Sequence, residues 1–282
     1  MKLILSRKGF DSSAGGVPSP LIENRPFSLP IPTRMPTPTR YCDLSNHISQ
    51  LVTDLSRGRI NSDLPCHLDP DLEANSLLRQ PGWRGALGQV SAAQSHLSNN
   101  GVGVGDLFLF WGLFRPAARN PGGTWTYTGD SEHRLFGWLQ VDEVLTIGED
   151  PSPALHRHPW LRCHPHLALG WTTNNTVYVA REKLTLPGAS SDLPGFGVLN
   201  RGFRLTARKS RQPSLWAAPS WLDPGRGGTG MTYHPPTRWN RDGTVQSAAR
   251  GQEFVADMGD RADAIAWILQ VLTNQSINYY TL

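Results

Sequence analysis

The chain has 282 residues, 38% of them hydrophobic, which is enough for one large domain with a sizeable core. Its formal net charge of +4 permits an anionic partner without requiring one. No apolar run approaches the roughly 18 residues of a membrane span, and residues 1–8 reach charged side chains too early for a signal peptide. The three scattered cysteines do not suggest a disulfide framework. We therefore expect a single cytoplasmic domain over residues 1–282, without a membrane partner.

The basic residues are mostly arginine. Of the 27 basic side chains, 23 are Arg and four are Lys. Guanidinium groups grip phosphates and stack on rings, although a GC-rich coding bias explains the same excess. Composition thus allows a nucleic-acid partner but does not decide the matter.

The first part of the chain alternates short elements with a proline-rich stretch. Residues 2–6 predict a strand. Residues 17–40 contain seven prolines, which exclude a helix and predict an extended arm lying over the body. Apolar residues on one face predict a helix over residues 44–55, and a second helix is expected at about residues 88–98.

The remainder of the chain is rich in predicted strands. Residues 106–114 are continuously apolar, which is typical of a strand covered on both faces. Further strands are expected at residues 135–147, 176–180 and 203–207, and an apolar face predicts a helix over residues 261–273. Because strands and helices mix without a regular βαβ rhythm, we expect an α+β fold whose mixed, largely antiparallel sheet is flanked by helices.

Two of these strands resemble the paired strands of PUA-like barrels, the ASCH and EVE domains. In those barrels a Gly-Asp pair opens one strand and a Gly-x-apolar-x-Val strand follows. The corresponding pieces here are Gly105-Asp106 and Phe136 to Val141. The resemblance implies a PUA-like partial barrel, and the alternative is simply two neighbouring core strands.

The turn after the first strand has the composition of an anion-binding cradle, with three glycines, small hydroxyl residues and positive charge. Its candidate ligand-binding side chains are Arg7, Lys8, Ser12 and Ser13. Asp11 either pairs with Lys8 or acts as a base. The turn lacks the spacing of a P-loop or a dinucleotide fingerprint, so an ordinary Gly/Ser loop remains the alternative.

A second polar group lies at His67, Asp69 and Asp71. At alternate positions these side chains could converge on a divalent metal or share a proton. Asp-Pro-Asp is equally a common start of a helix. Further along, glycines beside Gln89 would let a ligand approach the backbone, and Gln94 follows in the predicted helix.

Residues 156–166 hold four histidines and a cysteine, but without the paired spacing of a structural zinc site. We expect a surface loop and assign no metal site, and a site built from these histidines and the cysteine is the alternative.

Residues 201–211 contain five basic side chains and no acid. If this segment is a strand, Arg204 and Arg208 lie on one face at intervals of about 6.6–6.8 Å, which suits a phosphate backbone. Lys209 and Arg211 extend the candidate nucleic-acid surface. A solvated sheet face is the alternative.

Taken in order, stretches along nearly the whole chain resemble the third nucleotide modification-associated domain family of bacteria and phages. They are residues 1–13, 15–16, 18–20, 29–32, 67–72, 88–89, 92–94, 105–110, 136–141, 174–176, 214–216, 233–234 and 250–255. The resemblance implies a role with enzymes that alter or handle modified DNA bases. It supplies no catalytic residues.

We therefore predict an enzyme, or an enzyme component, that acts on a nucleotide or nucleobase in DNA base modification, for example by group transfer. The candidate acids and bases are Asp11, Asp69, Asp71 and Glu253. Gln94 and Gln252 are available for hydrogen bonds to base edges, and Gln89 is a further candidate substrate-binding residue. The alternative is a non-catalytic PUA-like reader in which Trp111 or Trp138 stacks on an extruded base. A nucleotide or DNA is the expected partner, and the sequence identifies no cofactor.

Overall fold

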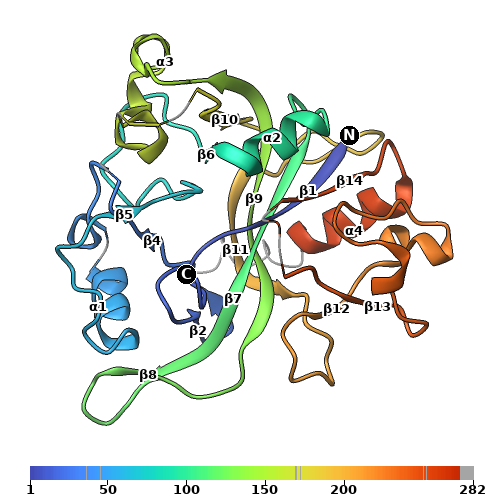
Figure 1. Cartoon of the computed structure of the whole chain (residues 1–282), viewed down its shortest axis with the longest axis horizontal. Helices are drawn as coiled ribbons and strands as arrows, with labels where there is room; N and C mark the ends of the chain where they lie inside the picture. Colours follow the sequence, from blue (N-terminus) through green and yellow to red (C-terminus); the bar gives the residue numbers. More distant parts are fainter. Residues whose placement is uncertain are drawn as a thin grey trace.

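The computed structural model describes residues 1–35, 37–44, 46–168, 170–171, 173–249, 251 and 253–273. Within these residues, ten strands form one mixed sheet that runs through the middle of the molecule (Figure 1). The central order is β14 (Glu253–Asp257), β1 (Lys2–Arg7), β7 (Leu107–Arg119), β9 (Glu132–Thr146), β10 (Thr176–Ala180) and β6 (Ala86–Gln89). Of these neighbours only β1 and β7 run parallel.

The other strands extend this sheet or form two small ones. In the main sheet, β11 (Phe196–Arg204) pairs with β9, β8 (Trp125–Tyr127) and β2 (Ser19–Ile22) pair with β7, and β3 (Arg25–Pro26) pairs with β2. The small sheets are β4 (Ile31–Pro32) with β5 (Cys66–His67) and β12 (Leu215–Ala217) with β13 (Thr244–Gln246).

Four α-helices are described: α1 (Asn46–Leu55), α2 (Ser91–Asn99), α3 (Ser152–Arg157) and α4 (Ala262–Thr273). Short 3₁₀ helices span Tyr41–Asp43, Pro159–Cys163, Pro165–Leu167, Ser220–Leu222, Pro224–Arg226 and Pro236–Arg238. In the part of the chain that the structure describes, no helix is both long and apolar enough to span a bilayer.

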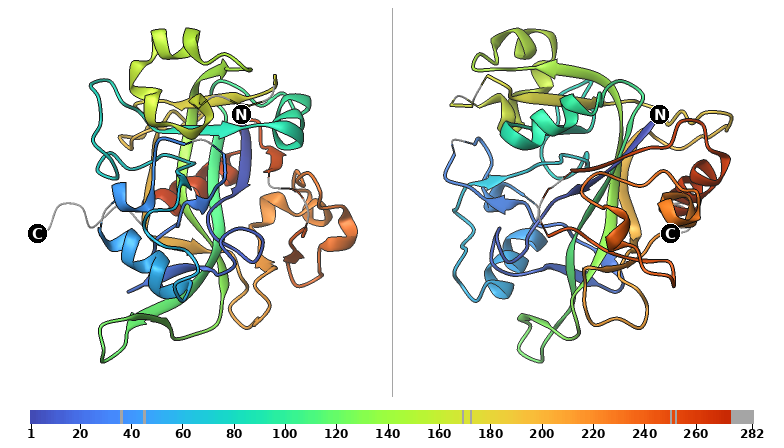
Figure 2. Two further views of the ribbon diagram at one scale, coloured as in Figure 1. Left: turned by 60° about the vertical axis from the view of Figure 1, so that its left-hand side comes forward. Right: turned by 45° about the vertical axis from the view of Figure 1, so that its right-hand side comes forward.

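Strand β1 is buried on both faces, and its alternating side chains face two different layers. Leu3 and Leu5 belong to a core cluster that includes Ile268 of α4, whereas Ile4 belongs to a second cluster with Leu97 of α2. Figure 2 shows α4 on one side of the sheet and α1 with the β4–β5 sheet on the other. The central sheet therefore has a covered layer on each face, which explains its nearly continuous apolar strands.

The structure confirms the predicted α+β class with a mixed, mostly antiparallel sheet. The strands expected at residues 2–6, 106–114, 135–147 and 176–180 are present, with shifts of a few residues at their ends. All three predicted helices form, although the second begins at Ser91 because residues 86–89 belong to β6. The described strands do not close into a barrel.

The structure does not show the extended arm that was predicted over residues 17–40; the described parts of this segment are paired into sheets. They provide β2 and β3 to the main sheet and β4 to a small one. Leu21 and Leu29 are buried. Proline is tolerated here because each of these pairings is only two or three residues long.

Two further expectations fail locally. The strand expected at residues 203–207 ends at Arg204, and Thr206 makes only an isolated bridge to Trp216. No helix begins at the described residues Asp69 to Asp71. Instead, the Asp69 carboxylate accepts the backbone N–H of Gly88, which ties this segment to β6 rather than capping a helix.

Candidate functional site

A cavity of about 490 Å³ opens where several elements that are distant in sequence meet. It lies at the carboxyl end of β1 and the end of β6, beside the segment after β5 and the side chains of His166 and Trp171. Its lining includes Arg7, Lys8, Asp11, Ser13, His67, Asp69, Gln89, His166 and Trp171. This volume is in the range of cavities that bind small molecules.

Lys8, which lines this cavity, lies between two acids. Its Nζ is 3.6 Å from Oδ2 of Asp69 and 3.7 Å from Oε1 of Glu253. These distances are ion pairs rather than hydrogen bonds, so the ammonium keeps donor capacity for a ligand. Two carboxylates share this one buried cation.

Glu253, the first residue of β14, is buried. Its Oε1 accepts hydrogen bonds from Ser6 Oγ at 3.0 Å and from Gln89 Nε2. Its Oε2 is also buried and has no hydrogen-bond partner among the described residues. Burial raises the pKa of the Glu253 carboxyl, against the attraction of Lys8.

Asp69 has the opposite electrostatic environment. Its Oδ1 accepts the N–H of Gly88 at 2.7 Å and lies 3.4 Å from Nε2 of His164. Burial alone would raise the pKa of the Asp69 carboxyl, but Lys8 and the neighbouring histidines hold it well below its usual range. The pKa of Glu253 is therefore raised and that of Asp69 is lowered, although both acids lie beside Lys8. Such a difference is characteristic of acid–base pairs.

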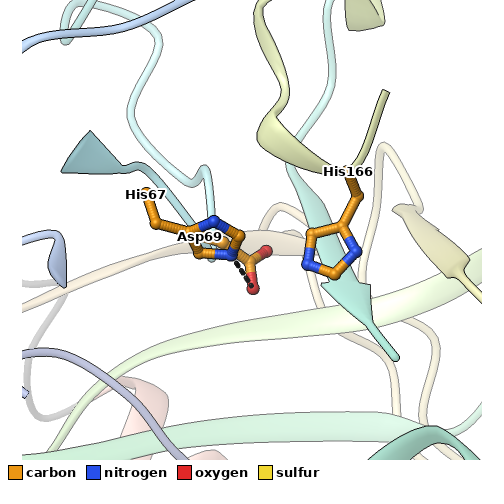
Figure 3. A group of neighbouring side chains, drawn as sticks. All are labelled: His67, Asp69 and His166. Carbon is orange, nitrogen blue, oxygen red and sulfur yellow. Dashed lines mark ion pairs between the residues drawn. The ribbon is translucent and has the colours of Figure 1, made fainter. Parts of the chain in front are cut away.

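Two histidines lie on either side of the Asp69 carboxylate (Figure 3). Nε2 of His67 is 3.8 Å from Asp69 Oδ2, and ligand atoms of His67, Asp69 and His166 all lie within 4.8 Å of one another. Burial lowers the pKa of His67 to about 4 and that of His166 to about 3, so both rings are neutral at pH 7. Trp171 stacks on His166 with ring centroids 4.4 Å apart.

In the turn after β1, the carboxylate of Asp11 accepts hydrogen bonds from the backbone of the turn itself. Asp11 Oδ1 accepts the backbone N–H groups of Ser13 at 2.6 Å and Ala14 at 2.8 Å, and Oδ2 pairs with Arg7 at 2.6 Å. The carboxylate of Asp11 thus occupies the N–H groups that were expected to hold a ligand. Arg7 and Lys8 are both paired with acids, so the cavity is mixed in charge rather than electropositive.

Residues 2–257 match the family model described as nucleotide modification associated domain 3. The chain belongs to this family. No curated protein and no solved structure matches it.

Membership associates the domain with nucleotide modification systems. The expected resemblance to the family is confirmed, and the match covers all the residues that form the site from Arg7 to Glu253. The match itself defines no catalytic activity, so the roles of individual residues remain predictions.

Several predicted residues of the domain lie away from the cavity. Asp71 is held by a two-pronged ion pair with Arg79 and faces a separate, smaller cavity of about 120 Å³. Gln94 is buried on α2, where its Oε1 accepts from the hydroxyl of Tyr178. Ser12 is exposed in the opening turn and is not among the residues that line the cavity. Gln252 lies outside the described residues.

The two tryptophans of the reader hypothesis belong to the core. Trp111 is only 1% exposed and packs against Trp216 and Phe254. Trp138 packs beside Gly197 and donates its Nε1–H to the carbonyl of Pro194. Neither side chain lines the cavity.

The basic segment does not present one row of guanidinium groups. Arg204 ends β11 and pairs with Glu132 at 3.0 Å. Arg208, Lys209 and Arg211 are exposed in the turn that follows. Arg211 is 4.0 Å from Asp130, whose side chain is also exposed.

Sequence reasoning missed the residues that complete the site on its histidine side. His164 and His166 are buried, although the segment was expected to be a surface loop. Asn175 holds His166, and Trp171 covers it. The excess of histidine was a usable signal, but the partners come from residues 67–69 and 175, which only the fold brings together.

Proposed function

We propose that the domain binds a nucleotide or nucleobase in the cavity at the end of β1 and acts on it in DNA base modification, as an enzyme or an enzyme component. The observation that carries the proposal is the convergence of Lys8, Asp69 and Gln89, from three separate parts of the chain, on the lining of one cavity. The buried Glu253 does not line the cavity but contacts Lys8 and Gln89. Family membership supplies the nucleotide-modification setting.

The contacts suggest a division of labour in this site. Lys8 has donor capacity toward a phosphate or a ring oxygen, since neither acid is within hydrogen-bond distance of Nζ. Glu253 offers a buried oxygen without a partner among the described residues, which suits a proton donor or acceptor. Asp69 remains ionised and supplies negative charge close to the reacting group. Asp11 and Arg7 hold the shape of the turn.

The reader hypothesis finds less support. A reader pocket would present aromatic faces and one or two amides, whereas this cavity is lined by carboxylates, histidines and a lysine. Trp171 is the ring that would stack on a base, in place of Trp111 and Trp138. DNA is the macromolecular partner we propose for the exposed Arg208, Lys209 and Arg211.

Nucleotide binding tests the first half of the proposal. Titration calorimetry of the full chain with each deoxynucleoside monophosphate should find at least one ligand. Lys8→Met should weaken its binding by about tenfold or more, the loss of one charge-assisted hydrogen bond. Lys183→Met removes an exposed lysine and serves as the matched control. No binding by the wild type, or full binding by Lys8→Met, would contradict the assignment.

Nucleoside mass spectrometry tests the second half. DNA from host cells that produce the wild type with its companion modification proteins should contain an altered nucleoside. Asp69→Asn and Glu253→Gln should remove it while Asp130→Asn, at an exposed position, should retain it. Modified DNA in cells with either site variant would exclude a catalytic role for that carboxyl group.

A further inference from the structure

We propose that His67, Asp69 and His166 bind one divalent transition metal ion at the edge of the cavity. The inference goes beyond the proposed function, and metal binding can be measured without any nucleotide. Two imidazoles and a carboxylate match the donor set that holds zinc in catalytic sites and iron(II) in facial-triad sites.

The spacing of the three groups suits a shared ion. Zinc or iron lies about 2.0–2.2 Å from nitrogen and oxygen ligands, so neighbouring ligand atoms are roughly 3–3.5 Å apart. The observed separation between His67 Nε2 and Asp69 Oδ2 is 3.8 Å, and the whole set lies within 4.8 Å. Small side-chain rotations would close this gap.

His166 is already oriented as a ligand. Its Nδ1 lies 2.6 Å from Oδ1 of Asn175, whose Nδ2 donates to the backbone carbonyl of His166. Because the amide oxygen accepts, Nδ1 carries the proton and the lone pair is on Nε2. Figure 3 shows one ring nitrogen of His166 directed toward Asp69 and the other directed away. Such an outer hydrogen bond accompanies almost every metal-binding histidine.

Asp69 is oriented in the same way. Nδ1 of His164 accepts the backbone N–H of His166 at 3.3 Å, and Nε2 of the same ring lies 3.4 Å from Asp69 Oδ1. The N–H of Gly88 donates to Oδ1. Both groups lie beside Oδ1, so Oδ2 is left for His67, Lys8 and a metal ion.

The local charge also favours a cation. Asp11 is paired with Arg7, whereas Asp69 and Glu253 lie at ion-pair distance from the same lysine, Lys8. A metal ion beside Oδ2 would compete with Lys8 there, and Lys8 would retain its contact with Glu253. Open coordination positions would then face the cavity.

Two titrations of the chelator-treated full chain test the site. Binding of Co²⁺ is followed by its visible absorption, and binding of Zn²⁺ is measured by competition against a chromophoric chelator. One ion per chain should bind. Asn175→Ala should weaken binding by about 10–100-fold, as expected for an outer partner. His67→Ala and His166→Ala should each weaken it further, and His156→Ala, at an exposed histidine, should have no effect.

The wild type provides a readout that does not depend on the folding of any variant. X-ray absorption of the Zn²⁺-loaded chain should show imidazole ligands together with oxygen. Failure of the wild type to bind one ion, a spectrum without imidazole, or unchanged affinity in a folded His166→Ala chain would each overturn the proposal. Metal binding without nucleotide binding would leave this site standing while refuting the proposed function.

Discussion

Gly88 leaves the space that the imidazole of His166 occupies: a Cβ built at Gly88 would overlap that ring. The backbone of Gly88 also donates its N–H to Asp69. One residue of β6 therefore determines the positions of two side chains of the site. The glycine is required here for close approach, since no positive φ is involved.

Gly88→Ala should therefore displace His166 and loosen the site. Overpacking of this kind lowers the free energy of unfolding by about 1–3 kcal/mol, and the affinity for Co²⁺ should fall along with it. Gly103→Ala is the matched control, because a Cβ there meets nothing within 4 Å. Urea unfolding and Co²⁺ titration of the two variants measure both effects. If Gly88→Ala kept the wild-type stability and affinity for Co²⁺, the ring of His166 would be able to move aside for the added methyl group without cost.

Lys8→Met should be costly for stability because it leaves two buried carboxyl groups without their cation. Breaking a buried ion pair from one side typically lowers the free energy of unfolding by about 3–5 kcal/mol. Adding Glu253→Gln to Lys8→Met should restore part of the lost free energy of unfolding, since the substitution replaces one of the two unpaired carboxyl groups with a neutral amide. Denaturant unfolding at pH 7 of the wild type, the two single variants and the double variant measures these free energies of unfolding. A double variant no more stable than Lys8→Met would mean that Glu253 does not interact with Lys8.

The strands and helices were predictable because their signals are local. Continuous apolarity identified β7, and a one-sided apolar pattern identified α1 and α4. The ends were less certain: β6 and α2 are separated by only one residue, Val90, so a single helix was expected where a strand and a helix occur.

The site was only partly predictable because its contacts join residues far apart in the chain. Lys8, Asp69, Gln89 and Glu253 were named from residue types alone, and the fold places them together. Asp71 was also named, but Arg79 holds it elsewhere, a pairing that no local pattern reveals.

The histidine side shows the same limit. His166 meets His67 across about a hundred residues, so no ligand spacing of the kind found in short zinc motifs exists in the sequence. Trp111 and Trp138 illustrate the converse error, because aromatic residues in long apolar strands are more often core than binding surface.

The exposed turn after β11 allows a test of the nucleic-acid surface. If Arg208, Lys209 and Arg211 contact DNA phosphates, replacing all three with Ala should weaken binding and reduce the salt slope by roughly 0.9 for each lost contact. Arg204→Ala should change the slope less, because Arg204 is paired with Glu132. Arg241→Ala, at another exposed arginine, is the control. Fluorescence anisotropy over a range of salt concentrations gives the slope. An unchanged slope in the triple variant would show that these three side chains do not contact DNA.

His133 should make the fold sensitive to acid. It is buried between Trp111 and Trp216, and its Nδ1 accepts the indole N–H of Trp216 at 2.9 Å. Burial, with a smaller contribution from Arg7, lowers the pKa of His133 to about 3. An unfolded histidine has a pKa of about 6.5, so the unfolded chain binds this proton first. The stability from neutral His133 is complete above that pH and is lost as pH falls toward 3.

Between pH 7 and pH 5 this single histidine should lower the free energy of unfolding by about 2 kcal/mol, at 1.36 kcal/mol for each pH unit below 6.5. His133→Asn keeps a hydrogen-bond acceptor for Trp216 but does not titrate. The stability difference between wild type and His133→Asn should therefore shrink by about that amount from pH 7 to pH 5. The free energy of unfolding of His156→Asn, at an exposed histidine, should change with pH in the same way as that of the wild type. Parallel curves for His133→Asn as well would show that His133 can be protonated without opening the core.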